Sequence, residues 1–195
     1  MASRSSKPEP APEVARLSVR EGGALRLAVL ADTHSALHPN ALRVLLALRP
    51  DAILHAGDIG DLRVLDELAG VCPVLAVRGN IDARRPGLAD VLVVEVVSTE
   101  ALILRMVLLH IGVYGPKLQA NAVRLARAQG ASVVVCGHSH VPFIGSDRGI
   151  TIFNPGSAGP RRFSLPVLLG MIDIGPNNFQ LKHFECSSGK LWAPP

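Results

Sequence analysis

Residues 26–58 read RLAVLADTHSALHPNALRVLLALRPDAILHAGD, and this stretch decides the fold class. It contains two short apolar runs, at residues 26–31 and 52–55, and each is followed closely by a carboxylate, Asp32 and Asp58. The segment between them has leucines spaced three and four residues apart, as on the apolar side of a helix. This strand–helix–strand order predicts a parallel sheet, and parallel sheets carry their ligand sites beyond the carboxyl ends of the strands.

The same alternation continues along the chain and then gives way to a run of strands. The first helix is expected from about Pro39, and a second starts after Asp61, whose carboxylate can cap it, and stops at Gly70. Further strands are predicted at residues 74–77, 91–97, 102–109, 133–136, 150–153, 167–174 and 179–184, with one more helix at 117–129. These elements predict a two-layer β core with helices on the outside.

The composition fits one packed globular domain. The chain has 195 residues, 48% of them hydrophobic, which is enough for one sizeable core and too few for two ordinary domains. The apolar runs are interrupted, by Glu95 and Arg105 for example, so none reaches the roughly 20 apolar residues of a membrane-spanning helix. The net charge of +4 comes with scattered arginines, so the composition predicts no stable nucleic-acid partner.

Residues 1–24 differ from the remainder in composition. They are rich in Ser, Pro, Lys and Glu, and we expect a mobile tail there, followed by a single domain at residues 25–190. The tail lacks the apolar segment of a secretory signal, and the three cysteines form no C-x-x-C pair, so we expect a cytoplasmic protein. A homo-oligomer is allowed, with the tail and residues 91–97 as candidate contact segments.

Five polar clusters stand just after predicted strands. They are Asp32-Thr33-His34, Gly57-Asp58, Gly79-Asn80-Ile81-Asp82, His110 and Gly137-His138-Ser139-His140. In extended backbone, residues i and i+2 project to the same side, so each D-x-H or H-x-H pair is expected to present two ligands together. Imidazole and carboxylate groups bind divalent cations such as Mn, Fe, Zn and Ni. Singly, these residues are typical of helix caps and core histidines; together they predict a metal site.

In this order, the clusters resemble the calcineurin-like metallophosphoesterase superfamily. The set D-x-H, G-D, G-N-x-D, H and G-H-x-H is followed by N-P-G-S at residues 154–157, and the match spans residues 27 to about 162. It is most similar to the small single-domain branch of bacterial and archaeal phosphodiesterases, whose Pro-Arg pair is matched by Pro160-Arg161. The resemblance implies an α/β (α+β) fold in which two packed β-sheets are flanked by helices, a four-layer αββα sandwich.

The resemblance also implies two divalent metal ions, with Mn preferred and Fe, Ni or Zn allowed. One ion would be held by Asp32, His34, Asp58 and His140, and the other by Asp58, Asn80, His110 and His138. Asp58 would therefore bridge both ions. Two ions about 3.5–4 Å apart can activate a bridging hydroxide as nucleophile and stabilise an in-line displacement, with no phosphoenzyme. Asp58, Asn80 and His110 are the residues expected to act in catalysis, and Asn80 is also expected to donate to a phosphoryl oxygen.

Two positions depart from the family pattern. Some members carry His directly after the G-N pair, where it helps to protonate the leaving group, and this chain has Ile81 there. General-acid help is typically worth about 10²–10⁴-fold, so we expect substrates with good leaving groups to react more readily. The second departure is Ile111, where the family usually has Gly directly after the histidine. Ile111 is expected to reshape the wall of the pocket.

Other polar residues near the motifs have simpler interpretations. Arg161 is the candidate substrate contact, because a guanidinium suits phosphate and it stands in the Pro-Arg pair. Arg78, Arg84, Arg85 and Arg162 also flank motif loops. His55 matches no motif and is expected to pack on its strand, and residues 154–157 are expected to support the site structurally.

The leading functional hypothesis is a dinuclear-metal phosphodiesterase that acts on small organic phosphodiesters. The alternative is a catalytically weak or inactive protein-binding scaffold, since the superfamily contains a trafficking subunit that keeps the fold with a degenerate metal site. A DNA-end nuclease like the larger members would need added segments for which this chain has no room. Every predicted ligand position carries a residue that can bind a metal, which favours the enzyme.

Overall fold

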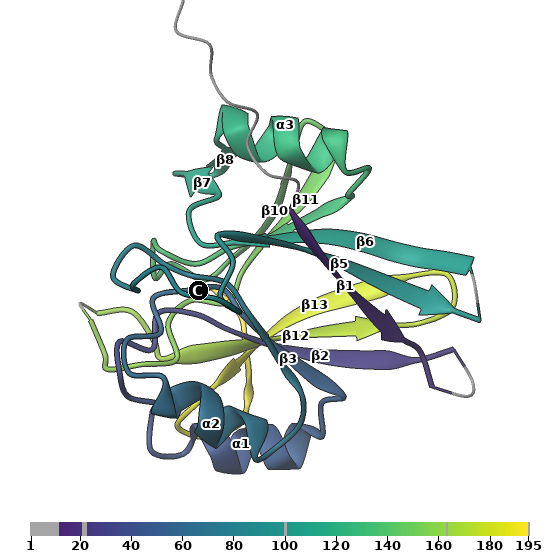
Figure 1. Cartoon of the computed structure of the whole chain (residues 1–195). Coiled ribbons are helices and arrows are strands. Elements are labelled where there is room, and N and C mark those ends of the chain that lie inside the picture. The colour runs from purple at the N-terminus through teal and green to yellow at the C-terminus, as the bar shows by residue number, and fades with distance from the viewer. Residues whose placement is uncertain (1–11, 21–22, 100, 163, 195) are drawn as a thin grey trace, which may run out of the picture.

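Two six-stranded β-sheets pack face to face in this molecule, as the computed structural model shows (Figure 1). The structure describes residues 12–20, 23–99, 101–162 and 164–194. The first sheet has the strand order β14-β13-β12-β2-β3-β4, and the second has the order β1-β5-β6-β9-β11-β10. The two sheets are the β core that the sequence predicts.

The first sheet is built from β2 (Leu25–Leu30), β3 (Ala52–His55), β4 (Val74–Ala76), β12 (Leu168–Ile174), β13 (Phe179–Glu185) and β14 (Leu191–Trp192). Strands β2, β3 and β4 are parallel, and β12 runs antiparallel to β2. The helices α1 (Ala41–Leu48) and α2 (Arg63–Ala69) connect the parallel strands and cover the outer face of this sheet (Figure 1). This is the predicted strand–helix–strand arrangement.

The second sheet is built from β1 (Glu13–Ser18), β5 (Val91–Ser98), β6 (Ala101–Leu109), β9 (Val133–Val135), β10 (Phe143–Asp147) and β11 (Ile150–Asn154). Strands β6, β9 and β11 are parallel, β10 runs antiparallel to β11, and β5 runs antiparallel to β6 but parallel to β1. A short hairpin, β7 (Val113–Tyr114) and β8 (Lys117–Leu118), precedes α3 (Ala120–Ala128), which covers the outer face (Figure 1).

The apolar core consists of three clusters, and each cluster fills the space between two adjacent layers of the predicted four-layer αββα sandwich. The inner faces of the two sheets meet in a cluster that includes Leu27, Leu54, Met106 and Phe153, all fully buried. Separate apolar clusters lie between the first sheet and α1 and α2, and between the second sheet and α3. The fold class expected from the sequence is confirmed.

The prediction of a mobile tail at residues 1–24 is wrong for residues 13–18. They form β1, which pairs in parallel with β5, so the sandwich begins before the predicted domain start at residue 25, and β14 extends it past residue 190. The physical reason is a period of two, because Ala15 and Leu17 pack on the inner core while Arg16 pairs with Glu95 on β5 at 3.1 Å. Residues 1–11 and 21–22 lie outside the described residues.

Other expectations need smaller corrections. The helix predicted at residues 117–129 begins only at Ala120, because residues 117–118 pair with β7. Strands β10 and β14 were not predicted. The segment at residues 91–97, a candidate contact segment, is β5, which lies buried between β1 and β6 and is not exposed for an oligomer contact. None of the described helices is long and apolar enough to cross a membrane.

Candidate metal centre

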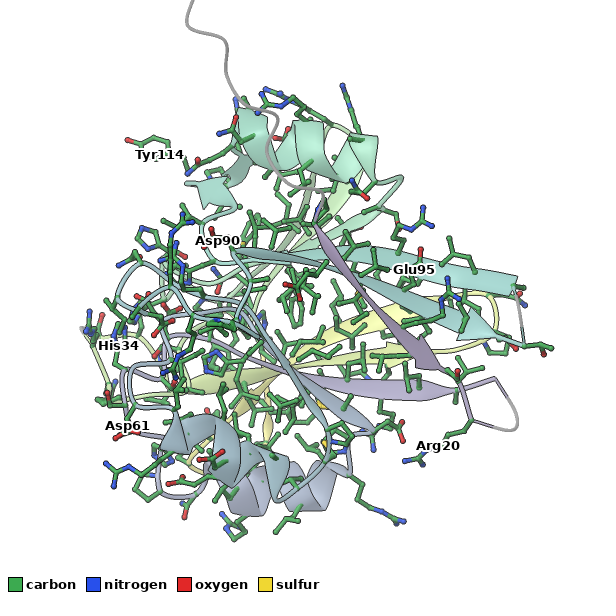
Figure 2. The ribbon with its side chains drawn as sticks, in the orientation of Figure 1. Arg20, His34, Asp61, Asp90, Glu95 and Tyr114 are labelled. Carbon is green, nitrogen blue, oxygen red and sulfur yellow. The ribbon has the colours of Figure 1, made fainter. Side chains whose placement is uncertain are left out.

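The predicted ligands lie in the loops that follow β2, β3, β4, β6 and β9, at one end of the sandwich. Figure 2 shows His34 at this end, together with Asp61, and Arg20 at the opposite end. Two backbone hydrogen bonds join the first two loops beyond the sheet, from the Asp32 N–H to the Gly57 carbonyl at 3.0 Å and from the His34 N–H to the Asp58 carbonyl at 3.0 Å. The parallel pairing of β2 and β3 thus continues into the site.

Five of the seven predicted ligands have left-handed backbone conformations. The φ angles are 55° at Asp32, 46° at His34, 54° at Asp58, 68° at His138 and 59° at His140. The expectation that each i, i+2 pair projects from extended backbone is therefore wrong, although both pairs do meet at the site. A left-handed non-glycine residue costs roughly 1–2 kcal/mol, and such strain persists only where surrounding contacts hold it in place.

The first group of donors comes from the loops after β2 and β9. The Nε2 atoms of His34 and His140 lie 3.2 Å apart, and the two rings stack. His140 Nε2 also lies 3.4 Å from Asp32 Oδ1. Asp32, His34 and His140 form one of two clusters in the described residues whose donor atoms are close enough to share a metal ion.

The second group comes from the loops after β4, β6 and β9. The side-chain oxygen of Asn80 lies 3.1 Å from His110 Nε2 and 3.0 Å from His138 Nδ1. The rings of His110 and His138 meet edge to face. Asn80 is therefore the common neighbour of both histidines in this group.

Asp58 lies between the two groups. Its Oδ1 atom lies 3.1 Å from His110 Nε2, and its Oδ2 atom lies 3.9 Å from His34 Nε2. Each carboxylate oxygen thus faces a different histidine group. The structure brings all seven predicted ligands together, and Asp58 has the central position that a bridging ligand would need.

The donor arrangement around His110 fits a divalent cation. His110 Nδ1 lies 2.8 Å from the Ala56 carbonyl, which only accepts, so Nδ1 carries the ring proton and Nε2 carries the lone pair. Burial lowers the pKa of His110, so the ring is neutral near pH 7. A lone pair then faces the Asp58 carboxylate at 3.1 Å, and a cation between the two atoms would relieve their repulsion.

The first group of donors, Asp32, His34 and His140, would also be stabilised by a bound cation. Burial, followed by the charge of Asp58, raises the pKa of Asp32 to about 8. Burial also lowers the pKa of His34, and lowers that of His140 to about 4, so these rings offer lone pairs. His140 Nδ1 is the one buried side-chain nitrogen or oxygen in the described part of the chain that has no hydrogen-bond partner. Two neutral imidazoles beside the buried carboxyl group of Asp32 form a donor set that suits a divalent metal.

Asp82 holds two of the ligand loops without reaching the donor groups. Its carboxylate accepts backbone N–H bonds from Ile59 at 3.1 Å, Gly60 at 2.8 Å and Gly79 at 2.8 Å. Burial opposes its ionisation, but these donors outweigh burial and lower the pKa of Asp82. Gly79 is required here for space, because a Cβ at that position would collide with the backbone and carboxylate of Asp58.

The N-P-G-S segment at residues 154–157 forms hydrogen bonds to two of the ligand loops, as expected for a segment that supports the site structurally. The Asn154 amide donates to the Gly137 carbonyl at 2.8 Å and to Ser139 Oγ at 3.1 Å. Ser157 Oγ donates to the Asp32 carbonyl at 2.9 Å. These bonds fix the loop that carries His138 and His140 against the loop that carries Asp32.

Two adjacent exposed arginines, Arg161 and Arg162, follow the N-P-G-S segment. The guanidinium of Arg161, the candidate substrate contact, donates to the Ser164 carbonyl at 3.4 Å. Burial lowers the pKa values of His34 and His140, and the charge of the neighbouring Arg162 adds to this effect, while at Asp32 it opposes part of the rise caused by burial.

Two other arginines near the motifs form ion pairs. Arg78 and Arg84 both bind Asp90, at 2.6 Å and 3.2 Å. Ile81 and Ile111 are exposed beside Asn80 and His110, as expected for positions that shape the pocket wall.

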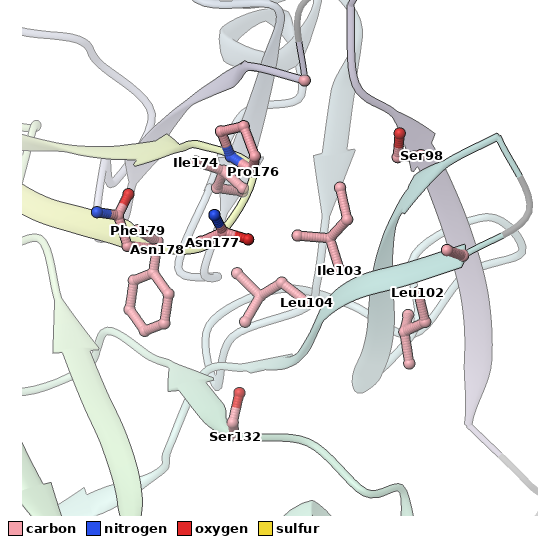
Figure 3. Close-up of a pocket in the computed structure, with 12 residues that line it drawn as sticks. Ser98, Leu102, Ile103, Leu104, Ser132, Ile174, Pro176, Asn177, Asn178 and Phe179 are labelled. Atoms are coloured by element: carbon pink, nitrogen blue, oxygen red, sulfur yellow. The ribbon is translucent and has the colours of Figure 1, made fainter.

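A separate cavity of about 700 Å³ lies at the opposite end of the sandwich (Figure 3). Its lining includes Leu102, Leu104, Ile174 and Phe179. None of the seven predicted ligands lines this cavity, so it is not part of the candidate metal centre.

The sequence of this chain matches a known protein family. The sequence model of the calcineurin-like phosphoesterase superfamily domain matches residues 25–175. A probable metallophosphoesterase from Methanocaldococcus jannaschii is 31% identical over 142 residues, which cover 70% of this chain and 69% of that relative.

Solved structures of related shape confirm the fold. Wild-type Vps29 complexed with Zn²⁺ from Entamoeba histolytica matches with a TM-score of 0.68 and 19% identity, over 86% of this chain and 96% of the other. A novel archaeal phosphodiesterase matches with a TM-score of 0.62 and 20% identity, over 82% of this chain and all of the other (100%). On the match of its sequence over residues 25–175 and its identity to the archaeal relative, this chain belongs to the calcineurin-like phosphoesterase superfamily.

Proposed function

We propose that this protein is a dinuclear-metal phosphodiesterase that hydrolyses small organic phosphodiesters. The observation that carries the proposal is the position of Asp58, whose Oδ1 lies 3.1 Å from His110 Nε2 and whose Oδ2 faces His34 Nε2 at 3.9 Å. A carboxylate with one oxygen toward each of two histidine groups is suited to bridge two ions.

Each group of donors would hold one ion, with Asp58 shared. Asp32, His34 and His140 would complete the first site, and Asn80, His110 and His138 the second. When bound, a pair of divalent ions would polarise the phosphoryl group and lower the pKa of a coordinated water.

Three residues would have further roles in the reaction. His110, anchored through Nδ1 to the Ala56 carbonyl, would present Nε2 in a fixed direction. Asn80 would bind through its oxygen, which leaves its amide N–H groups to donate to a phosphoryl oxygen. Ile81 cannot give a proton to the departing alkoxide, so the leaving group would depart without help from this position.

Support for a diester comes from charge and from similarity. A diester carries one negative charge at neutral pH, and the charge of Arg162, which acts on Asp32, His34 and His140, would complement it. The similarity in fold to an archaeal phosphodiesterase points the same way.

The chemistry of the donors indicates the metal, and the free cysteines indicate the compartment. Mixed imidazole, amide and carboxylate donors suit Mn²⁺, which we propose as the working ion, with Fe, Ni and Zn as substitutes. The free cysteines Cys72, Cys136 and Cys186 fit a reducing compartment, so we propose the cytoplasm.

A protein-binding scaffold is the second candidate. The similarity to Vps29, a vacuolar protein sorting protein, supports it, because that match covers nearly the whole of the other chain. The enzyme is the better supported, because all seven positions carry donors and these donors converge at one end of the sandwich.

The test is hydrolysis of a chromogenic phosphodiester and of the matching monoester. Metal-stripped protein is assayed with Mn²⁺, Ni²⁺, Zn²⁺ or Mg²⁺ added back, beside Asp61→Asn as a control that changes a carboxylate bound to Arg63 instead of a donor. The proposal expects metal-dependent turnover with the diester preferred, in both wild type and control. Turnover of the monoester alone would overturn the diester assignment, and inactivity with every metal would favour the scaffold.

A further inference from the structure

His55 lies under the metal centre and uses both of its ring nitrogens. It is the last residue of β3 and is fully buried, and the sequence predicts only packing for it. Its Nε2 lies 3.1 Å from Thr33 Oγ1, and its Nδ1 accepts from the Gly57 N–H at 3.3 Å. Neither His55 nor Thr33 belongs to the predicted ligands.

The hydrogen bonds define which ring nitrogen carries the proton. Thr33 Oγ1 donates its single proton to the Ile59 carbonyl at 3.1 Å, so it can only accept from His55. His55 must therefore carry its proton on Nε2. The Gly57 N–H faces Nδ1, which agrees with a lone pair on that nitrogen. The two nitrogens are fully used in this neutral tautomer, so His55 has no free donor for a metal.

This chain of bonds connects the two loops that carry three of the predicted ligands. Thr33 stands between two of these ligands, in the loop after β2, and Gly57 directly precedes the third, Asp58. Backbone hydrogen bonds already join these two loops, and the contact between the His55 ring and the Thr33 hydroxyl adds a side-chain connection between them.

We propose that His55 is a positioning residue that fixes the spacing between the loop after β2 and the loop after β3, and so sets the affinity for the metal pair. The proposal deepens the proposed function and rests on it. The left-handed conformations of Asp32 and Asp58 need contacts that hold them in place, and the Thr33–His55–Gly57 chain supplies such contacts directly beside them. Residues that orient metal ligands typically contribute roughly 10–100-fold in metal affinity.

Variants separate this role from simple packing. His55→Leu removes both hydrogen bonds, and Thr33→Val removes the acceptor, whereas His55→Gln and Thr33→Ser keep a polar partner. Leu54→Ala is the matched control, because Leu54 is the fully buried neighbour on the same strand and packs in the inner core.

The first measurement is the affinity for Mn²⁺, by calorimetry on the metal-stripped full chain, well below the unfolding temperature of each variant. We expect roughly 10–100-fold weaker binding in His55→Leu and in Thr33→Val. The double variant should lose no more than either single one, and His55→Gln and Thr33→Ser should recover part of the affinity. Wild-type affinity in His55→Leu, or an equal loss in Leu54→Ala, would overturn the proposal.

The second measurement needs neither metal nor a variant. Nitrogen-15 NMR of histidine-labelled, metal-free protein should show the His55 ring protonated at Nε2, and protonation at Nδ1 would overturn the proposal. Both measurements are independent of hydrolysis. If wild type binds Mn²⁺ but cleaves no phosphodiester, the proposed function fails alone, and if cleavage is intact while His55→Leu keeps its affinity, the positioning role fails alone.

Discussion

The Nε2 atom of His110 lies 3.1 Å from Oδ1 of Asp58, although these residues follow strands of different sheets. Because the Ala56 carbonyl holds the ring proton on Nδ1, the contact joins a lone pair to a carboxylate. The two sheets of the sandwich thus meet at this end through groups that attract a cation, which is the physical basis of the candidate metal centre.

Stability of the metal-free protein should depend on pH through Asp32. Its folded-state pKa is about 8, well above the ordinary value of about 3.9, so above pH 4 the folded chain binds a proton that the unfolded chain has released. The free energy of unfolding therefore falls as pH rises toward 8. Five histidines have folded-state pKa values below the ordinary value of about 6.5, and they oppose this trend mainly below about pH 6.5: His34, His55, His110, His140 and His183.

The window from about pH 6.5 to 8 accordingly isolates Asp32. Urea denaturation of metal-free protein should show stability falling there by up to about 1.4 kcal/mol per pH unit. Asp32→Asn should remove the slope. A wild-type slope of zero, or one that Asp32→Asn leaves unchanged, would show that Asp32 is not the group responsible.

Position 81 should control which leaving groups can depart. Ile81→His places a proton donor beside Asn80, so it should accelerate alkyl esters, which have poor leaving groups, by on the order of tenfold more than nitrophenyl esters. The measurement is kcat for both classes in wild type and variant. Equal acceleration of the two classes would show that protonation of the leaving group is not limited at this position.

The two adjacent arginines should differ in their effect on substrate binding. Arg162→Ala removes the charge that acts on the metal-centre donors, and we expect KM for the phosphodiester to rise about tenfold, which corresponds to about 1.4 kcal/mol. Arg161→Ala removes a guanidinium bound to the Ser164 carbonyl and should leave KM nearly unchanged. The reverse order, measured under the same metal and salt concentrations, would return the role to Arg161.

Gly79 should tolerate no side chain. In Gly79→Ala the new Cβ would collide with the backbone and carboxylate of Asp58, so the variant should lose binding of at least one metal ion. Gly70→Ala, at a helix end with φ of −65°, is the control and should bind as wild type does. Calorimetric titration of Mn²⁺ compares the two variants, and full stoichiometry in Gly79→Ala would contradict the close approach.

The sequence predicts the strand ends well, because there a buried apolar run must give way to polar residues. The steps from Leu30 to Asp32 and from His55 to Asp58 are of this kind, and both mark real ends of strands. Strand β1 was missed, because the alternation of Ala15 and Leu17 stands next to a Pro-rich segment and becomes a strand only through pairing with β5.

The detailed site depends on contacts that no local pattern contains. The left-handed backbone at Asp32 and Asp58 is held by hydrogen bonds between two loops, and the tautomer of His110 is fixed by the distant Ala56 carbonyl. The ordered motifs therefore indicate which residues meet, whereas the orientation of each donor follows from the tertiary structure.

The most direct test of the account is the number of Mn²⁺ ions bound per chain, measured together with phosphodiester hydrolysis in wild type and Asp58→Asn. Wild type should bind two ions per chain and hydrolyse the phosphodiester. Asp58→Asn should bind at most one ion tightly and show no measurable turnover, with the circular-dichroism spectrum of the folded protein unchanged. Two ions retained in Asp58→Asn with turnover equal to wild type would contradict the bridging role of Asp58 and the mechanism that depends on it.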